Sequence, residues 1–127
     1  MGGTQLGRVQ LMIMQVLWNR GQATARQITD DLNEIEPMAH STVQTLLRGL
    51  EDKQAVDHKA DGRTFVFFPL VEEDNFKSSA TSELLTRVFQ GKAHDLVAHL
   101  LADKQVSADE LAEIRKLINR KARKEKM

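Results

Sequence analysis

The segment HSTVQTLLRGLEDK, residues 40–53, decides the fold of this 127-residue chain. Its apolar residues recur at the spacing of one helix face, and they are Val43, Leu46, Leu47 and Leu50. Ser41 and Gln44 have the spacing of a capping box, which satisfies free N–H groups at the start of a helix. The segment therefore predicts an amphipathic helix, and its outward polar face consists of Thr42, Gln44, Thr45 and Arg48.

The residues before this helix predict two further helices. Apolar positions within residues 6–19 recur at helical spacing, and Gly21 suits the left-handed residue that follows a helix end. Thr24 is placed to cap a short second helix. Residues 33–39, which include Pro37, are predicted to form a loop before the third helix.

The residues after this helix predict a β-hairpin. Residues 55–59 and 64–69 are short β-prone runs, and Asp61 and Gly62 lie between them. Asp-Gly between two such runs is a strong hairpin signal, because the turn needs positive φ. Three helices followed by a hairpin are typical of the winged-helix arrangement, a helix-turn-helix variant with a β-wing. The predicted fold class is mainly α with a small β-hairpin wing.

Beyond Pro69 the sequence predicts helices without strands. Three short amphipathic helices of this size cannot close a core of their own. The expected cover for their apolar faces is a second copy of the segment, which gives a two-fold homodimer. We therefore expect a DNA-binding domain at residues 1–70 and a dimerisation region at residues 71–127. The predicted dimer residues are Leu84, Val88, Leu96, Val97, Leu100, Leu101, Leu111, Ile114, Leu117 and Ile118.

Composition narrows the class of protein. Hydrophobic residues make up 41% of the chain and charged residues 28%, as in a soluble globular protein. No signal-peptide pattern, membrane-length apolar run or cysteine is present, which fits a cytoplasmic protein without disulfides. The formal net charge is zero, so DNA binding requires local clustering of cations or two modules per site. Nothing in the sequence predicts an enzyme or a cofactor.

The outward face of residues 40–53 supplies the main candidates for DNA contact. Gln44 suits adenine, Arg48 suits guanine, and threonine methyls suit thymine. Arg63 at the wing, with Lys59 before it, is placed for phosphate or the minor groove. His40 and Ser41 begin the helix and are candidate contacts as well.

The aromatic residues and the histidines do not predict a base-stacking site or a metal site. Trp18, Phe65, Phe67 and Phe68 are interpreted as core and hairpin residues and not as base-stacking residues. The four histidines are scattered, and His94 and His99 lack the i, i+4 spacing of a metal pair, so no metal site is predicted.

Taken in order, these motifs resemble the penicillinase-repressor family, which includes the BlaI and MecI repressors and copper-responsive relatives. The matching strings are Leu17-Trp18, Gly21, residues 24–28, residues 41–47, Gly62-Arg63, residues 65–70, residues 89–91, residues 96–100 and residues 107–111.

The resemblance implies a homodimeric repressor on an inverted-repeat operator that controls genes for β-lactam resistance, metal handling or stress. It also adds Arg26 as a phosphate contact at the start of the second helix. It further implies a membrane sensor protease as a partner. However, the family's Asn-Phe cleavage pair would align with His99-Leu100 here, and thiolate copper sensing is excluded because cysteine is absent.

Two other classes stay open at this point. A winged helix can serve as a protein-interaction module without binding DNA, and the zero net charge is its best support. A regulator that binds a small molecule between the C-terminal helices is the second alternative.

Overall fold

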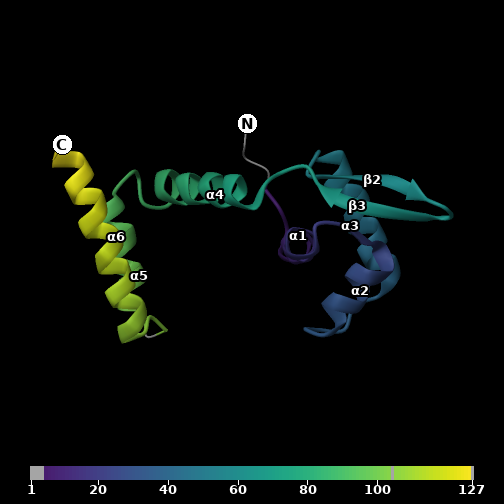
Figure 1. Ribbon diagram of the computed structural model, residues 1–127, viewed down its shortest axis with the longest axis horizontal. Helices are drawn as coiled ribbons and strands as arrows, with labels where there is room; N and C mark the ends of the chain where they lie inside the picture. The colour runs from purple at the N-terminus through teal and green to yellow at the C-terminus, as the bar shows by residue number, and fades with distance from the viewer. Residues whose placement is uncertain (1–4, 104, 127) are drawn as a thin grey trace. The chain divides into compact units, whose positions relative to one another are not determined.

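The computed structural model describes residues 5–103 and 105–126, and it confirms a mainly helical winged-helix fold with further helices after it. Figure 1 shows the elements in chain order. They are α1 (Arg8–Arg20), β1 (Ala23–Thr24), α2 (Ala25–Asn33), α3 (His40–Asp52), β2 (Val56–Asp61), β3 (Thr64–Pro69), α4 (Glu73–Arg87), α5 (Ala93–Ala102) and α6 (Ala108–Lys126).

The core lies where α1, α2 and α3 pack against one another and against the sheet. Leu17 of α1, Ile28 of α2 and Leu50 of α3 have no exposed surface. The predicted apolar stripe of α3 is confirmed, because Val43 and Leu47 are also buried and Leu46 packs against the same cluster. The polar face of α3 is exposed as a result.

The helix ends match the predictions at two of three positions. Thr24 caps α2, because its hydroxyl accepts from the Gln27 amide at 3.1 Å while the Gln27 side chain accepts from the Thr24 amide. Gly21 follows α1 with a φ of 87°, as the stop signal predicted.

The capping box predicted at Ser41 and Gln44 is wrong. Helix α3 begins two residues earlier than that cap implies, at His40, and Ala39 is its N-cap, without a side-chain hydrogen bond. Ser41 is thus already inside the helix, where its carbonyl accepts a hydrogen bond from the Thr45 hydroxyl at 3.1 Å.

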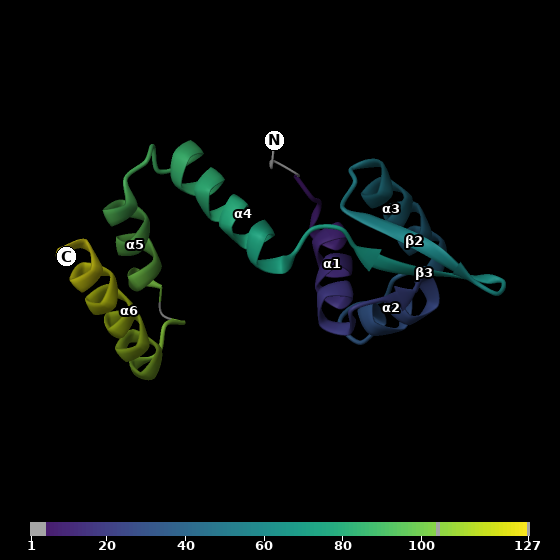
Figure 2. The same cartoon turned by 45° about the horizontal axis from the view of Figure 1, so that its top comes forward.

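A three-stranded antiparallel sheet closes one side of the core and extends as the wing (Figure 2). Strands β2 and β3 pair from Val56–Pro69 to Asp61–Thr64, and Gly62 at the turn has a φ of 67°. The predicted hairpin is therefore confirmed. Strand β1 was not predicted, because two residues carry no periodic pattern; it pairs with β3 at Phe67 and Val66.

The chain divides into two compact units between Thr81 and Ser82, within α4. Trp18 explains why the first unit includes the start of α4. Its indole N–H donates to the Val71 carbonyl at 2.8 Å, and its ring lies 5.5 Å from that of Phe76. Trp18 also packs against the core, as predicted.

The second unit contains the end of α4 with α5 and α6, and its apolar side chains lack cover. No residue described in α4, α5 or α6 is buried. The Ser107 hydroxyl accepts from the Glu110 amide at 3.1 Å at the start of α6. None of the described helices is long and apolar enough to cross a membrane.

An ion pair between α1 and α2 predicts a pH-dependent contribution to stability. Two hydrogen bonds from Arg20, at 2.7 and 2.9 Å, hold the pKa of Asp31 below its ordinary value. The pair therefore stabilises the fold above the pKa of an unfolded Asp, about 4, and this stability is lost as the pH falls through the folded value. Arg20→Gln should move the Asp31 pKa back up and lower the free energy of unfolding at neutral pH.

NMR titration of the Asp31 carboxyl group in both proteins measures this shift. Arg20→Lys is the matched control, because it keeps the charge but not the two-pronged geometry. An Asp31 pKa that does not change in Arg20→Gln would contradict the assignment.

Candidate nucleic-acid interface

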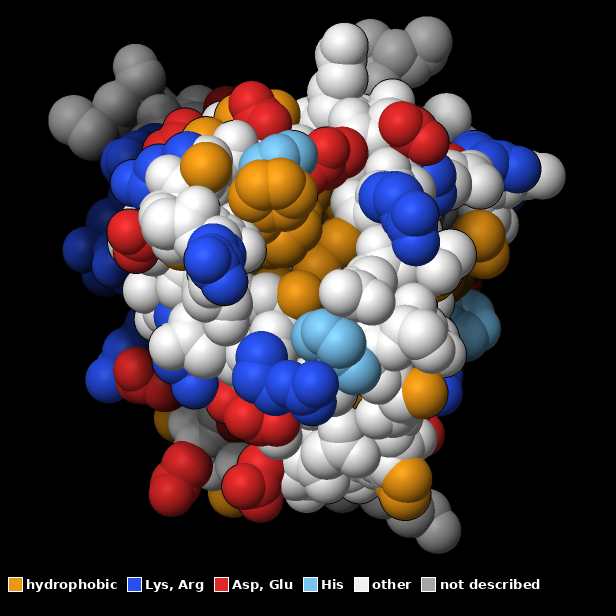
Figure 3. Space-filling view, turned by 90° about the vertical axis from the view of Figure 1, so that its right-hand side faces the viewer, with side chains coloured by type: hydrophobic (Ala, Val, Ile, Leu, Met, Phe, Trp, Pro, Cys, Tyr) orange, Lys and Arg blue, Asp and Glu red, His pale blue; other side chains and the backbone are white. Residues whose placement is uncertain are grey.

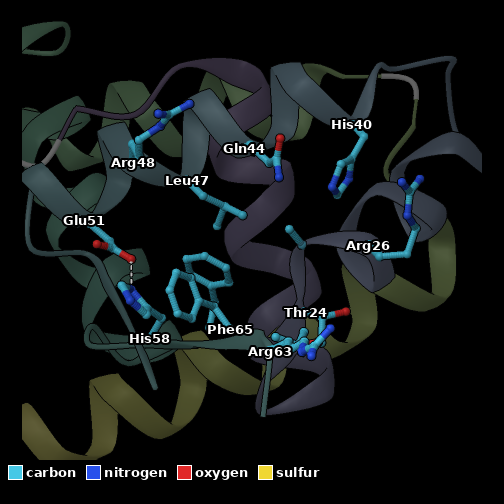
Figure 4. A pocket seen from close by; sticks show the side chains of 13 residues that line it. Thr24, Arg26, His40, Gln44, Leu47, Arg48, Glu51, His58, Arg63 and Phe65 are labelled. Carbon is cyan, nitrogen blue, oxygen red and sulfur yellow. Dashed lines mark hydrogen bonds and ion pairs between the residues drawn. The ribbon is translucent and has the colours of Figure 1, made fainter. Parts of the chain in front are cut away.

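A hollow of about 560 Å³ lies between α3 and the wing, and the start of α2 borders it. Figure 3 shows this face, with hydrophobic side chains in the hollow and Lys, Arg and His side chains around it. The residues that line it are Thr24, Ala25, Arg26, His40, Gln44, Leu47, Arg48, Glu51, His58, Arg63, Thr64, Phe65 and Phe67. Figure 4 shows these side chains from close by.

The structure brings five of the predicted DNA-contact residues together in this hollow. Arg26 comes from α2, His40, Gln44 and Arg48 come from α3, and Arg63 comes from the wing turn. The other predicted residues do not line it, although all are exposed: they are Ser41, Thr42 and Thr45 on α3 and Lys59 on β2. The candidate surface is thus the hollow together with the exposed face of α3.

The arginines that border the hollow are free to meet an anion. Among the described residues, Arg26, Arg48 and Arg63 form no ion pair, whereas Arg8 and Arg20 elsewhere are paired with carboxylates. Glu51 is the acidic residue that lines the hollow, and it interacts with His58. The net charge of the whole chain is zero, but this surface carries a local excess of positive charge. The zero net charge therefore does not argue against DNA binding here.

His40 is held so that one nitrogen stays available. The Thr29 hydroxyl donates to the Ala25 carbonyl at 2.8 Å, and His40 Nδ1 lies 3.0 Å from the same hydroxyl oxygen. Because that hydroxyl has a single proton, the Nδ1–H of His40 is assigned as the donor to Thr29. Nε2 of His40 is then left to interact at the hollow.

Lys53, just after α3, forms hydrogen bonds within the protein and does not line the hollow. Its ammonium donates to the Gln5 carbonyl at 2.7 Å and to the Gln10 side chain at 3.0 Å. These contacts tie the end of α3 to the residues around the start of α1. Arg48 is consequently the basic residue by which α3 itself can meet DNA.

Phe65 is a hairpin residue, as interpreted, because its ring packs against His58 of β2, but it also lines the hollow. Phe65 and Phe67 lie on the same face of β3, but Phe67 is 9% exposed and Phe65 is 53% exposed. The hairpin extends beyond the helices (Figures 1 and 2), and along β3 Phe65 is two residues nearer the turn than Phe67. Sequence reasoning missed Phe65, Glu51 and His58 as site residues. The two-residue period of a β-strand indicates that Phe65 and Phe67 share a face of β3. It does not indicate which of the two is covered by the core.

Glu51, Asp57 and His58 form a small cluster at one end of the hollow. Each offers one ligand atom, and these atoms lie within 4.8 Å of one another. The imidazole already bonds to the Glu51 carboxylate, and the Asp57 carboxylate accepts from the His58 amide at 2.8 Å. Hydrogen bonds within the cluster account for this arrangement without a metal ion.

The fold and this surface define a winged-helix DNA-binding protein. The family model described as penicillinase repressor matches residues 6–120. The chain belongs to this family, whose members are DNA-binding transcriptional repressors and not enzymes.

Individual relatives cover most of the chain. The methicillin resistance regulatory protein MecI of Staphylococcus aureus strain N315 is 26% identical over 117 residues, which is 92% of this chain and 95% of that protein. The penicillinase repressor of Bacillus licheniformis is 25% identical over 90% of this chain and 89% of its own. The solved DNA-binding domain of the repressor BlaI is 28% identical, with a TM-score of 0.51 over 56% of this chain and 87% of that one.

Proposed function

We propose that the protein is a cytoplasmic, sequence-specific repressor that binds an inverted-repeat operator as a homodimer. The free guanidinium groups around the hollow, beside the exposed face of α3, carry this proposal. In it, α3 lies in the major groove and reads bases through Gln44 and Arg48, with Ser41, Thr42 and Thr45 alongside. Arg26, His40, Lys59 and Arg63 contact the backbone or the minor groove.

The dimer is supported by the apolar surface of the second unit. Val88 is 65% exposed, Leu100 53% and Leu117 58%, which is unusual for large apolar side chains clustered in short helices. Leu96 and Ile114 are half-buried, and the other predicted dimer residues are exposed. A second copy would cover these side chains, so residues 71–127 are proposed to dimerise. The two α3 helices would then lie about 34–36 Å apart, or a multiple of that distance.

Titration of a duplex from the promoter region of the protein's own gene tests this function. Full-length protein is added to the labelled duplex and to an unrelated duplex at several salt concentrations, and anisotropy is recorded. A repressor prefers the first duplex and shows a steep salt dependence. A protein-interaction module shows neither, so equal and weak binding to both duplexes would overturn the proposal.

Arg48→Ala should weaken operator binding and change its salt dependence. If Arg48 meets a phosphate, the slope of log K against log salt should fall by about one per half-site. If Arg48 pairs with guanine, affinity should fall by about 5- to 150-fold and selectivity at one position should be lost. The same anisotropy titrations measure both effects.

Two variants make this prediction specific. Gln44→Ala removes a neutral side chain from the same hollow, so it should lower selectivity and leave the salt slope unchanged. Arg87→Ala removes a cation that is paired with Glu83 at 2.9 Å on α4, and it should leave both unchanged. Wild-type affinity and slope in Arg48→Ala would remove Arg48 from the interface.

A further inference from the structure

Phe65 places an apolar ring in the middle of the charged hollow. The ring faces Leu47 in Figure 4, with Glu51 and His58 to one side of it. It is 53% exposed, whereas Phe67 beside it on β3 belongs to the core. No residue of the described chain therefore covers the outer face of this ring.

The ring is held in place by a chain of contacts that begins on α3. Glu51 of α3 bonds to Nδ1 of His58 on β2. The imidazole lies against Phe65, with ring centroids 4.3 Å apart and planes at 33°, and it also contacts Phe67 at 5.4 Å. Because α3, β2 and β3 all take part, the exposed face of Phe65 is presented in a fixed position.

The position of the hollow indicates what would cover that face. The inference rests on the proposed function, in which α3 lies in the major groove and the wing contacts the flanking backbone or minor groove. A sugar–phosphate strand separates the two grooves, and it would have to cross the hollow between α3 and the wing. Arg26 and Arg63, which the proposed function places at the backbone or the minor groove, suit the phosphates of that strand. A phenyl ring suits the apolar face of a deoxyribose.

We infer that Phe65 packs against a deoxyribose of the bound DNA and that His58 and Glu51 act as positioning residues for it. A thymine methyl group is the other apolar surface that DNA offers. The threonines expected to meet thymine methyl groups, Thr42 and Thr45, lie on the face of α3 outside the hollow. The backbone is therefore the better occupant of the hollow.

Anisotropy titrations test the sugar contact by comparing the affinities of full-length wild type, Phe65→Ala and Phe65→Leu for the promoter duplex and for the unrelated duplex. Phe65→Ala should weaken binding to both duplexes by the same factor of about ten, the effect expected when part of a phenyl face is no longer buried. The slope of log K against log salt should stay unchanged, because no charge is lost. Phe65→Leu should retain part of the affinity. Arg63→Ala is the matched control on the wing, and it should lower the slope instead.

A double-mutant cycle of His58→Ala and Phe65→Ala tests the positioning role. His58→Ala should weaken binding less than Phe65→Ala does, also without a change of slope. The double variant should be no weaker than Phe65→Ala alone, because His58 acts through the ring. Additive losses would remove the positioning role.

The possible outcomes separate this inference from the function on which it rests. If wild type shows no sequence preference and no salt dependence, the proposed function fails. If wild type binds and both Phe65 variants bind equally well, the sugar contact fails alone. If only the promoter duplex is affected, and uracil in place of thymine removes the difference between wild type and Phe65→Ala, the contact is to a methyl group and the inference is overturned. Circular dichroism melting establishes whether the variants are folded. If Phe65→Ala is unfolded, the binding of Phe65→Leu tests the sugar contact instead.

Discussion

Leu117→Glu should convert the protein into a monomer and lower its operator affinity by about a hundredfold or more. Leu117 lies in α6 and is 58% exposed. No described residue of that helix is buried. A carboxylate in the proposed interface would lose its hydration without gaining a partner. Once the dimer is lost, each half-site binds alone, and the gain from linking two modules, about 10²–10⁴, is lost with it.

Sedimentation equilibrium and anisotropy titration measure the two parts of this result. Asn119→Glu is the matched control, because it adds the same charge two residues away, on the opposite side of the same exposed helix. It should leave the protein dimeric and its affinity close to that of wild type. A Leu117→Glu protein that remains a dimer would show that the apolar face of α6 is not the interface.

Leu50→Ala should lower the free energy of unfolding by about 2–5 kcal/mol, as other deletions of buried leucine side chains do. Leu50 has no exposed surface, and it belongs to the cluster in which α3 meets the other helices and the sheet. A typical domain has about 5–15 kcal/mol in total, so this loss is a large part of its stability.

Urea unfolding followed by circular dichroism measures this loss. Thr45→Ala is the control on the exposed face of the same helix. It should change the free energy of unfolding by less than about 0.5 kcal/mol, while it remains a candidate for weaker DNA binding. Equal effects of the two substitutions on stability would contradict the burial pattern of α3.

The elements that rest on local patterns were predictable. The stripe from Val43 to Leu50 identifies α3, Thr24 identifies the start of α2, and Gly62 identifies the wing turn. Each depends on residues close together in the sequence, and the structure confirms each of them. The cap predicted at Ser41 is wrong although the motif spacing is met, because the backbone becomes helical two residues earlier than that cap implies.

The features that depend on distant contacts were not predictable. Strand β1 exists because Ala23 and Thr24 pair with β3, more than 40 residues later. The bond between Glu51 and His58 joins a helix to a strand, and no local spacing marks it. Phe65 is exposed although it shares a face of β3 with the buried Phe67, and this difference depends on how far the helices cover the sheet.

Trp18 gives the protein a built-in spectroscopic probe. The chain has one tryptophan and no tyrosine, so its near-ultraviolet emission comes almost entirely from one position. That indole is hydrogen-bonded to Val71 and lies against Phe76, where the first compact unit continues into α4. Its emission maximum and lifetime therefore report, without any label, whether the start of α4 stays docked against the first unit when the protein binds DNA.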